Sequence, residues 1–269
     1  MAKFSAGFIG SGNMGGALAI AVCKKIDPAG VVLTDYDLEK AKAVAGICGC
    51  IAADTETVAK ESDYLFLGVK PQVLDGVLRQ LAPMLAARKD RVVLVSMAAG
   101  VSVAHIQEVL GDNYPIIRIM PNMPVTVGKG MILYATNADV TEQEKQQFTA
   151  MMGGAGSLDQ LEEKLIDAGS AVSGCGPAFA YLFVEALADG GVECGLPRNK
   201  ALQYAAQTLL GAAEMVLATG KHPGELKDAV CSPGGTTIAG VHALEEGGFR
   251  SAAMDAVCAA YRRTKELSK

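Results

Sequence analysis

A glycine motif near the start of the chain constrains its fold most strongly. Gly10-Ser11-Gly12-Asn13-Met14-Gly15 follows a short apolar run containing Phe8 and Ile9, and a helix-like apolar stretch, residues 17–22, follows the motif. A strand, three glycines at this spacing and a helix form the turn that holds a dinucleotide pyrophosphate at the positive end of the helix dipole. The same pattern also fits a simple glycine-rich bend. Its place after the first apolar run favours the dinucleotide site.

Strand-like and helix-like segments alternate from residue 4 to about residue 137 and predict a parallel sheet covered by helices on both faces. The expected strands are 4–9, 31–35, 64–69, 92–97, 116–120 and 131–135, and the expected helices are 38–48, 72–87 and 102–110. After about residue 155 the strands stop, and helices are expected at 177–193, 197–219, 224–230, from 236, and at 249–267. We therefore expect an α/β protein with an N-terminal Rossmann-type domain (1–158) and a C-terminal all-helical domain (159–269).

The segment PAFAYLFVEALADGGVECG, residues 177–195, is apolar over most of a helix circumference. A helix of that kind must be buried on all sides. In a domain of only about 110 residues this is easiest when a second subunit supplies one wall. The helical domain is therefore expected to dimerise, and burial within one subunit is the alternative.

Composition excludes several other classes of function. The net charge of −5 and the lack of a Lys/Arg cluster argue against a nucleic-acid partner. No run of 18 apolar residues predicts a membrane span, and the first residues lack a signal-peptide pattern. The seven cysteines show no C-x-x-C pair, and Cys48-Gly49-Cys50 is too closely spaced, with no histidine nearby, to suggest a metal site. We expect reduced thiols in a cytoplasmic chain with no metal.

The second expected strand ends in an acidic residue, Asp35, about 20 residues beyond the glycines, where a carboxylate accepts hydrogen bonds from the adenosine ribose. Such a carboxylate repels a 2′-phosphate, so it favours NADH over NADPH unless a flanking side chain compensates. Asp37 is a second candidate, and a simple strand end at Asp35 is the alternative. Two further strand ends, FLGVKPQ and VSMAAGV, should face the cofactor because ligands bind beyond the carboxyl ends of parallel strands. Their expected cofactor contacts are Val69, Lys70, Pro71, Met97, Ala98 and Ala99.

In the helical half, SPGGTT (232–237) combines a flexible backbone with an expected helix start. Successive N–H groups there form an anion nest that fits a small carboxylate, although Thr236 and Thr237 are also ordinary N-cap residue types. VSGCGPAFAY (172–181) is a comparable element. The chain has only three histidines and no Ser-His-Asp set. This sparse acid–base equipment suits a substrate that is already electrophilic, such as a protonated imine.

Six stretches together resemble the pyrroline-5-carboxylate reductases. They are GFIGSGNMGGAL, VKPQ, SMAAGV, RIMPNMP, VSGCGPAFAYLFVEALADGGVECGLPR and HPGELKDAVCSPGGTTIAGVHALEEGGFRSA, and they extend from residue 7 to about residue 267. The resemblance implies reduction of 1-pyrroline-5-carboxylate to L-proline with NADPH or NADH, the last step of proline biosynthesis. It also implies a homodimer built through the helical domains, assembly of dimers into a decamer, and a substrate site at the dimer interface.

The resemblance also implies roles for particular residues. Thr237 is the hydroxyl that hydrogen-bonds the ring nitrogen as its proton donor, and Glu163 contacts the substrate. The substrate carboxylate is held by Ser232, Gly235 and Thr236. Besides the strand-end residues above, the implied cofactor contacts are Ile9, Gly10, Ser11, Gly12, Asn13, Met14, Gly15, Asp35 and Asp54.

Two positions depart from the family pattern. Cys175 stands where the family usually has serine, which weakens one hydrogen bond, and Asp54 stands where many members have asparagine. With Asp35, the second departure predicts that NADH is used at least as well as NADPH.

Two other classes of function fit part of the sequence. A β-hydroxyacid dehydrogenase has a similar first motif, but it needs a lysine four residues beyond the second glycine of a G-x-G helix start, where this chain has Ala180. Reduction of a ketone requires an acid for the new alkoxide, so the missing lysine counts against this class. A non-enzymatic sensor of NAD(P)H would explain the glycine motif but would leave SPGGTT without a purpose.

Overall fold

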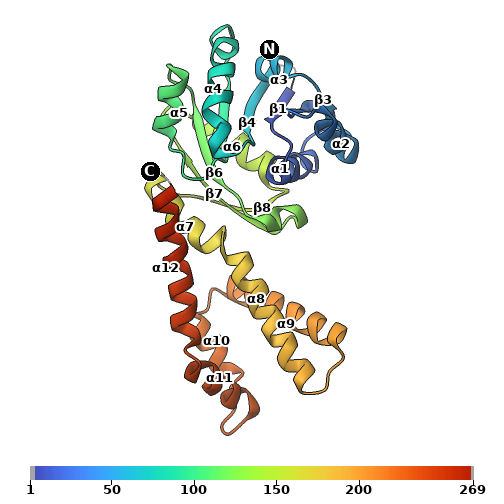
Figure 1. Ribbon diagram of the computed structural model, residues 1–269, viewed down its shortest axis with the longest axis vertical. Helices are drawn as coiled ribbons and strands as arrows, with labels where there is room; N and C mark the ends of the chain where they lie inside the picture. The colour runs from blue at the N-terminus through green and yellow to red at the C-terminus, as the bar shows by residue number, and fades with distance from the viewer. Residues whose placement is uncertain (1–3, 268–269) are drawn as a thin grey trace. The chain divides into compact units, whose positions relative to one another are not determined.

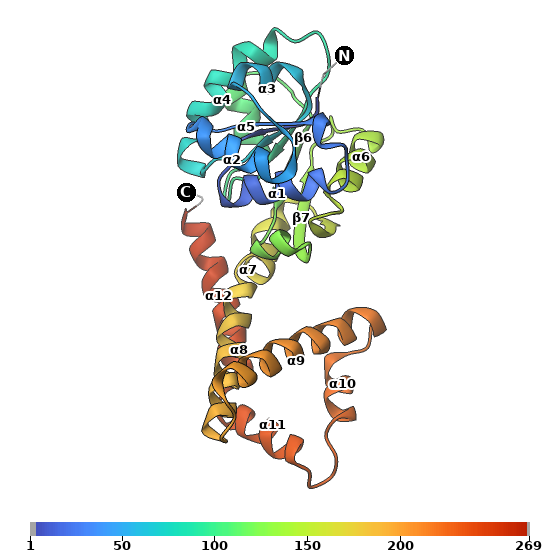
Figure 2. The same ribbon diagram turned by 90° about the vertical axis from the view of Figure 1, so that its right-hand side faces the viewer.

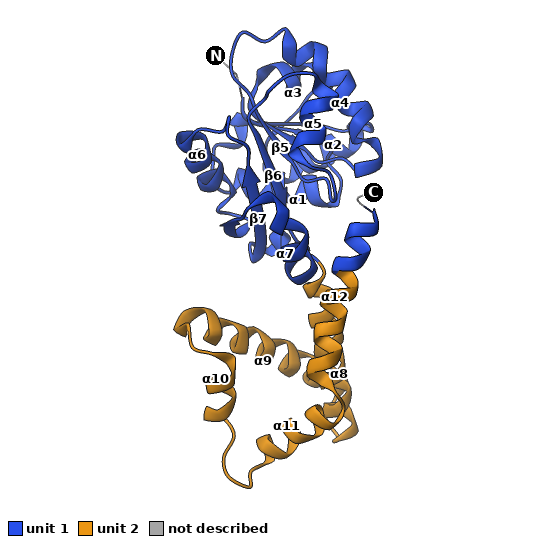
Figure 3. Ribbon diagram, turned by 90° about the vertical axis from the view of Figure 1, so that its left-hand side faces the viewer, with its two compact units in different colours: residues 1–174, 261–269 blue, residues 175–260 orange. Residues whose placement is uncertain are grey.

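The computed structural model describes residues 4–267 (Figure 1), which form two compact units (Figure 3). Of the described residues, the first unit comprises 4–174 and 261–267, and the second 175–260. The expected boundary between residues 158 and 159 falls inside strand β8 (Gly156–Gln160), which pairs with β7 (Gly130–Thr136). The sheet unit therefore continues beyond the predicted boundary.

The first unit is built on an eight-stranded sheet of order β3-β2-β1-β4-β5-β6-β7-β8. Its other strands are β1 (Phe4–Ile9), β2 (Val31–Thr34), β3 (Ile51–Ala52), β4 (Ser62–Leu67), β5 (Val93–Ser96) and β6 (Ile116–Met120). The first six strands are parallel and have the order of a Rossmann domain. β7 pairs antiparallel with β6, because only a short 3₁₀ turn, η2 (Met123–Val127), connects them and a parallel crossover needs a longer connection. The predicted parallel sheet is therefore confirmed for β1 to β6, whereas β7 and β8 run antiparallel to those strands.

Helices cover both faces of this sheet (Figure 1). α1 (Asn13–Cys23), α2 (Leu38–Cys48) and α6 (Glu142–Met152) pack on one face, and α3 (Thr55–Glu61), α4 (Pro71–Ala86) and α5 (Val103–Leu110) on the other. Phe66 and Leu65 are both fully buried but belong to opposite faces, because successive strand residues alternate. Burial on both faces gives the strands the continuous apolar runs that made them recognisable in the sequence. The 3₁₀ turns η1 (Pro28–Gly30) and η3 (Glu163–Leu165) and helix α7 (Ile166–Ser173) complete the unit.

The second unit is helical (Figure 2). It contains α8 (Gly176–Glu193), α9 (Arg198–Thr219), α10 (Pro223–Ala229), α11 (Thr236–Glu246) and most of α12 (Phe249–Leu267), so the five helices predicted there are confirmed. Among its described residues the buried core is one small cluster, Ala188, Ala201 and Ala205.

Large apolar side chains of the helical unit are exposed in the isolated chain. Leu182 is 68% exposed and Leu217 81% exposed, and α8 buries only Ala188. The alternative reading, in which α8 is buried within one subunit, is therefore wrong. A core of this size cannot stabilise a domain, so the exposed apolar surface requires a further covering.

One helical stretch among the described residues, Glu163–Glu193, is long and apolar enough by length and composition to cross a membrane, and 11% of its apolar window is buried. The sequence expectation of no spanning segment rested on uninterrupted apolar runs, and this stretch is interrupted by charged residues. Protein and lipid are both suitable coverings for such a surface.

Candidate active site

The glycine motif brings three backbone segments into direct contact. Gly10 has φ +99°, a conformation that favours glycine, and its N–H donates to the Thr34 carbonyl at 2.9 Å. A β-carbon on Gly15 would lie 2.2 Å from the Gly10 carbonyl oxygen, and one on Gly68 would lie 2.7 Å from the same oxygen. The end of β1, the start of α1 and the end of β4 therefore meet backbone to backbone, as the predicted dinucleotide turn requires.

Gly12 is different, because a β-carbon there would meet no atom within 4 Å. It is the N-cap of α1, and no side chain caps this helix. The first N–H groups of α1 are therefore left for a ligand. This is the geometry that lets a backbone approach a pyrophosphate.

These two glycines give a matched pair of variants. Gly15→Ala is expected to lower the free energy of unfolding by about 1–3 kcal/mol, because the methyl group collides with backbone, and to weaken NADH binding. Gly12→Ala is expected to leave the melting temperature unchanged and to weaken NADH binding alone. Thermal melts and fluorescence titration with NADH check both results. A Gly12→Ala protein that binds NADH like the wild type would argue against a pyrophosphate at this turn.

Asp35, just beyond β2, is tied to the glycine motif. Its carboxylate accepts the Ser11 N–H at 2.7 Å, the Ser11 hydroxyl at 3.1 Å and the Asp37 N–H at 3.1 Å. Burial alone would raise the pKa of Asp35, but these hydrogen bonds and the charge of Lys40 hold the pKa below its usual range. Asp35 therefore stays ionised at the place predicted for the adenosine ribose. Asp37 caps α2 by accepting the Glu39 N–H at 3.2 Å.

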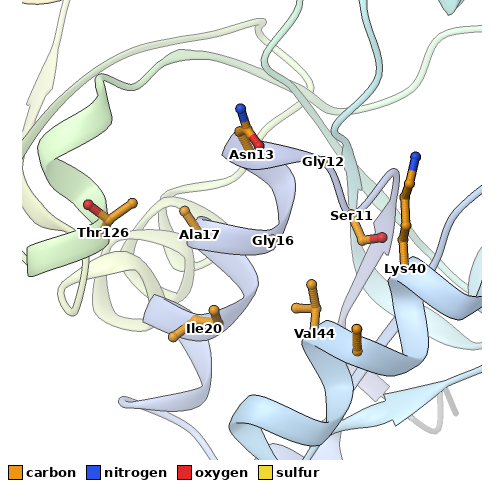
Figure 4. A pocket seen from close by; sticks show the side chains of 10 residues that line it. Ser11, Gly12, Asn13, Gly16, Ala17, Ile20, Lys40, Val44 and Thr126 are labelled. Carbon is orange, nitrogen blue, oxygen red and sulfur yellow. The ribbon is translucent and has the colours of Figure 1, made fainter.

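A cavity of about 520 Å³ lies beside the motif, between α1, α2 and η2 (Figure 4). Its lining residues are Ser11, Gly12, Asn13, Gly16, Ala17, Ile20, Lys40, Ala43, Val44 and Thr126. Lys40 is the positively charged side chain among these lining residues, and it was not predicted from the sequence. The sequence does contain an indication of this role. A lysine in the first turn of a helix interacts unfavourably with the helix dipole, so its presence there indicates a second interaction, such as binding of an anion.

The remaining predicted cofactor residues lie at neighbouring strand ends. Val69, Lys70 and Pro71 follow β4, with Pro71 opening α4 and the Lys70 side chain exposed. Met97, Ala98 and Ala99 follow β5. Pro71 and Ala99 line one cavity of about 590 Å³, so the structure brings these two segments together.

Asp54 has a structural role at the start of α3. It is the N-cap of this helix, and its exposed carboxylate accepts the Thr57 N–H at 2.7 Å. This hydrogen bond holds the pKa of Asp54 below its usual range. The cap accounts for an acidic residue at this position without a cofactor.

Glu163 lies in the first unit and belongs to a buried ionic network. Its Oε1 accepts the Val103 N–H at 2.8 Å and Arg118 Nη1 at 3.3 Å. Arg118, on β6, is 4% exposed and pairs through Nη2 with Asp167 Oδ1 at 2.8 Å, and Lys265 Nζ lies 3.0 Å from Asp167 Oδ2. Sequence reasoning missed Arg118 and Asp167. An arginine inside the apolar strand IIRIM was the signal, since a buried charge needs a partner.

Ser232 to Thr237 lie in the helical unit. The Ser232 carbonyl accepts the Gly235 N–H at 3.0 Å, and Gly234 has φ +69°, so the segment forms a glycine-dependent turn immediately before α11. The N-cap of α11 is Gly235 and no side chain caps the helix, so the reading of Thr236 and Thr237 as N-caps is wrong. By contrast α2, α3, α5 and α6 are capped by side chains. The structure thus leaves the first N–H groups of α11 open to an anion.

The second expected nest, around Cys175, does not form. Gly174 and Cys175 both keep right-handed helical backbone angles between α7 and α8. An anion nest needs a reversal of backbone handedness, which this segment lacks.

Comparison with known families matches both parts of the chain. Residues 163–267 match the family described as "Pyrroline-5-carboxylate reductase dimerisation", and residues 5–100 match "NADP oxidoreductase coenzyme F420-dependent". The first match begins where the apolar stretch 163–193 begins, so the exposed apolar surface belongs to a dimerisation domain.

Several relatives align over almost the whole chain. The "Pyrroline-5-carboxylate reductase" of Glycine max is 44% identical over 269 residues, covering 99% of this chain and 97% of the relative. That of Methanosarcina acetivorans is 41% identical, covering 98% and 97%.

Solved structures give the same result. A pyrroline-5-carboxylate reductase from Coxiella burnetii superposes with a TM-score of 0.91 at 32% identity, over 99% of both chains. The Plasmodium falciparum pyrroline carboxylate reductase with NADP bound gives a TM-score of 0.87 at 31% identity, over 100% of both chains. The chain belongs to the pyrroline-5-carboxylate reductase family.

Proposed function

We propose that the two sites bind the two reactants of one reaction. The glycine motif binds the cofactor, and the start of α11 binds the substrate. The reaction is that of the family, reduction of 1-pyrroline-5-carboxylate to L-proline by hydride from NAD(P)H, the last step of proline biosynthesis. The open, glycine-capped start of α11 is the observation that carries this division, because an anionic substrate needs such a site.

The substrate carboxylate is held by Ser232, Gly235 and Thr236 at this helix start. Thr237 donates its hydroxyl hydrogen bond to the ring nitrogen, and Glu163 contacts the substrate. A hydride from the nicotinamide adds to the imine carbon while the nitrogen acquires its proton. The cofactor supplies the reducing chemistry when bound, and the protein supplies orientation and charge.

Loss of NADH or NADPH absorbance on adding 1-pyrroline-5-carboxylate tests the function directly. Rapid turnover with either cofactor supports the reductase. Turnover with neither would favour a sensor of NAD(P)H or a reductase of another imine.

NADH is used at least as well as NADPH in this proposal, because Asp35 is ionised beside the glycine motif. The 2′-phosphate of NADPH would meet that negative charge. Lys40 is the flanking cation that offsets part of the repulsion.

Asp35→Asn is expected to shift kcat/KM towards NADPH by roughly tenfold, which equals about 1.4 kcal/mol. Asparagine retains an acceptor for the Ser11 N–H, but its NH2 group cannot accept the Asp37 N–H, so the variant removes the charge and one hydrogen bond of the loop. Lys40→Met is expected to shift the ratio the opposite way, and Asp37→Asn, at the cap of α2, to leave it unchanged. Initial rates with both cofactors measure the ratio. A wild-type KM for NADPH far below that for NADH would contradict the proposal.

The dimerisation domain forms a homodimer in this proposal, and dimers assemble into a decamer. The support is the exposed apolar surface of the helical unit and its small alanine core. Light scattering during size-exclusion chromatography distinguishes a monomer, a dimer and a decamer. The seven free cysteines fit the cytoplasmic location expected from the sequence.

A further inference from the structure

Three cysteines that are distant in the sequence meet in the first unit. Cys23 is the last residue of α1, Cys48 is the last residue of α2, and Cys50 lies just before β3. Their sulfur atoms all lie within 4.8 Å of one another, and those of Cys48 and Cys50 are 3.3 Å apart. Among residues 4–267, this is the one group of three or more His, Cys, Asp or Glu side chains that comes together in this way.

The expectation of no metal rested on the lack of a C-x-x-C pair and on the close spacing of Cys48 and Cys50 with no histidine nearby. Spacing along the chain does not reveal the third thiol, which arrives on a different helix. Gly49 has φ +76° and ends α2 in the left-handed conformation, which reverses the chain and returns Cys50 to the side of Cys48.

The distances fit a single bound ion. Thiolates about 2.3 Å from one zinc ion are spaced roughly 3.8–4.0 Å from one another. The Cys48–Cys50 sulfur separation is 3.3 Å and the other two are at most 4.8 Å, so small side-chain rotations bring the three thiolates to that spacing.

The electrostatic surroundings also favour a cation. α1 and α2 both end at this cluster, and the C-terminal end of a helix carries partial negative charge. Such ends disfavour a bare thiolate and stabilise a bound cation.

One side of the cysteine cluster faces the apolar core and the other side faces solvent. Cys23 and Cys50 pack against the buried core of the sheet, yet all three cysteines are only partly buried. An ion therefore has both a low-dielectric wall and a path of entry.

We propose that Cys23, Cys48 and Cys50 bind a thiophilic d¹⁰ cation, Zn²⁺ or Cu⁺, through three thiolates. Soft thiolate sets select these ions, and in the zinc form a solvent water is the fourth ligand. Because α1 and α2 also line the cavity beside the glycine motif, the ion fixes the separation of the two helices at that cavity.

The test uses the full-length, reduced protein after removal of metal. Zn²⁺ alone is titrated in competition with a chromophoric chelator, and Cu⁺ is titrated anaerobically with its own chelator in a second arm. We expect one equivalent per chain in at least one arm, and at least about a tenfold loss of affinity in Cys23→Ser, Cys48→Ser and Cys50→Ser. Cys258→Ser, which removes an exposed thiol on α12, is the control and keeps wild-type affinity.

Cobalt(II) provides a readout of ligation that does not depend on activity. Binding through thiolates produces near-ultraviolet charge-transfer absorption in the wild type and in Cys258→Ser, and weaker absorption in Cys50→Ser. Circular dichroism identifies any serine variant that fails to fold, and the variants that fold then carry the test. Lack of stoichiometric uptake of both ions, unchanged affinity in the folded serine variants, or a disulfide within the trio in place of bound metal would each overturn the proposal.

Discussion

Replacing Arg118 with methionine is expected to lower the free energy of unfolding by about 3–5 kcal/mol. Methionine keeps a long apolar side chain but removes the guanidinium that pairs with Asp167 at 2.8 Å. Asp167 is 8% exposed, so its carboxylate would stay buried with Lys265 as its remaining ionic partner. Lys265 is itself about half exposed, so it offsets only part of the desolvation cost of the buried carboxylate once the guanidinium is gone. Urea unfolding of both proteins at one fixed concentration measures the difference, because association would otherwise change the apparent stability.

Two further variants separate the ion pair from simple loss of packing. Lys265→Met removes an ammonium group whose side chain is 47% exposed, and is expected to cost no more than about 1 kcal/mol. Arg118→Met combined with Asp167→Leu is expected to recover most of the lost stability, because no buried charge is left unpaired. An Arg118→Met protein as stable as the wild type would show that the network does not hold the unit together.

Local patterns were enough to predict most of the sheet unit. The strands β1 and β6 and helix α2 have the predicted ends, because an apolar run or an apolar helical face is a local property of the chain. β8, with the sequence GSLDQ, was missed because a half-exposed edge strand needs no apolar run. α6 was missed for a similar reason, since it is mainly polar and its start depends on a capping box at Thr141.

The candidate site divides in the same way. The glycine turn and the start of α11 are continuous stretches, so their backbone geometry followed from residue types alone. Arg118 and Asp167 are 49 residues apart in the sequence. Cys23, at the end of α1, lies close to Cys50, which precedes β3. Such pairs are created by the packing of elements, which a single sequence does not display. The exposed apolar face of α8 shows the same limit, because the covering that it needs lies outside the chain.

Replacing Thr237 with valine is expected to lower kcat by about 10²–10⁴-fold, the usual contribution of a positioned proton donor. Valine preserves the shape of the side chain and removes only the hydroxyl group. Thr237 is exposed in the first turn of α11, and the N-cap of that helix is Gly235. The helix therefore does not depend on the Thr237 hydroxyl, and the melting temperature should be unchanged. Steady-state rates with saturating NADH and 1-pyrroline-5-carboxylate measure the effect.

Thr237→Ser is the matched control, because it restores a hydroxyl at the same position and should recover most of the rate. The Kd for NADH should be the same in all three proteins, since the cofactor is assigned to the glycine motif. A loss confined to KM would mean that Thr237 binds the ground state as tightly as the transition state and does not supply the proton. A Thr237→Val enzyme within about tenfold of wild-type kcat would transfer that role to water. The open start of α11 would then serve only to hold the carboxylate.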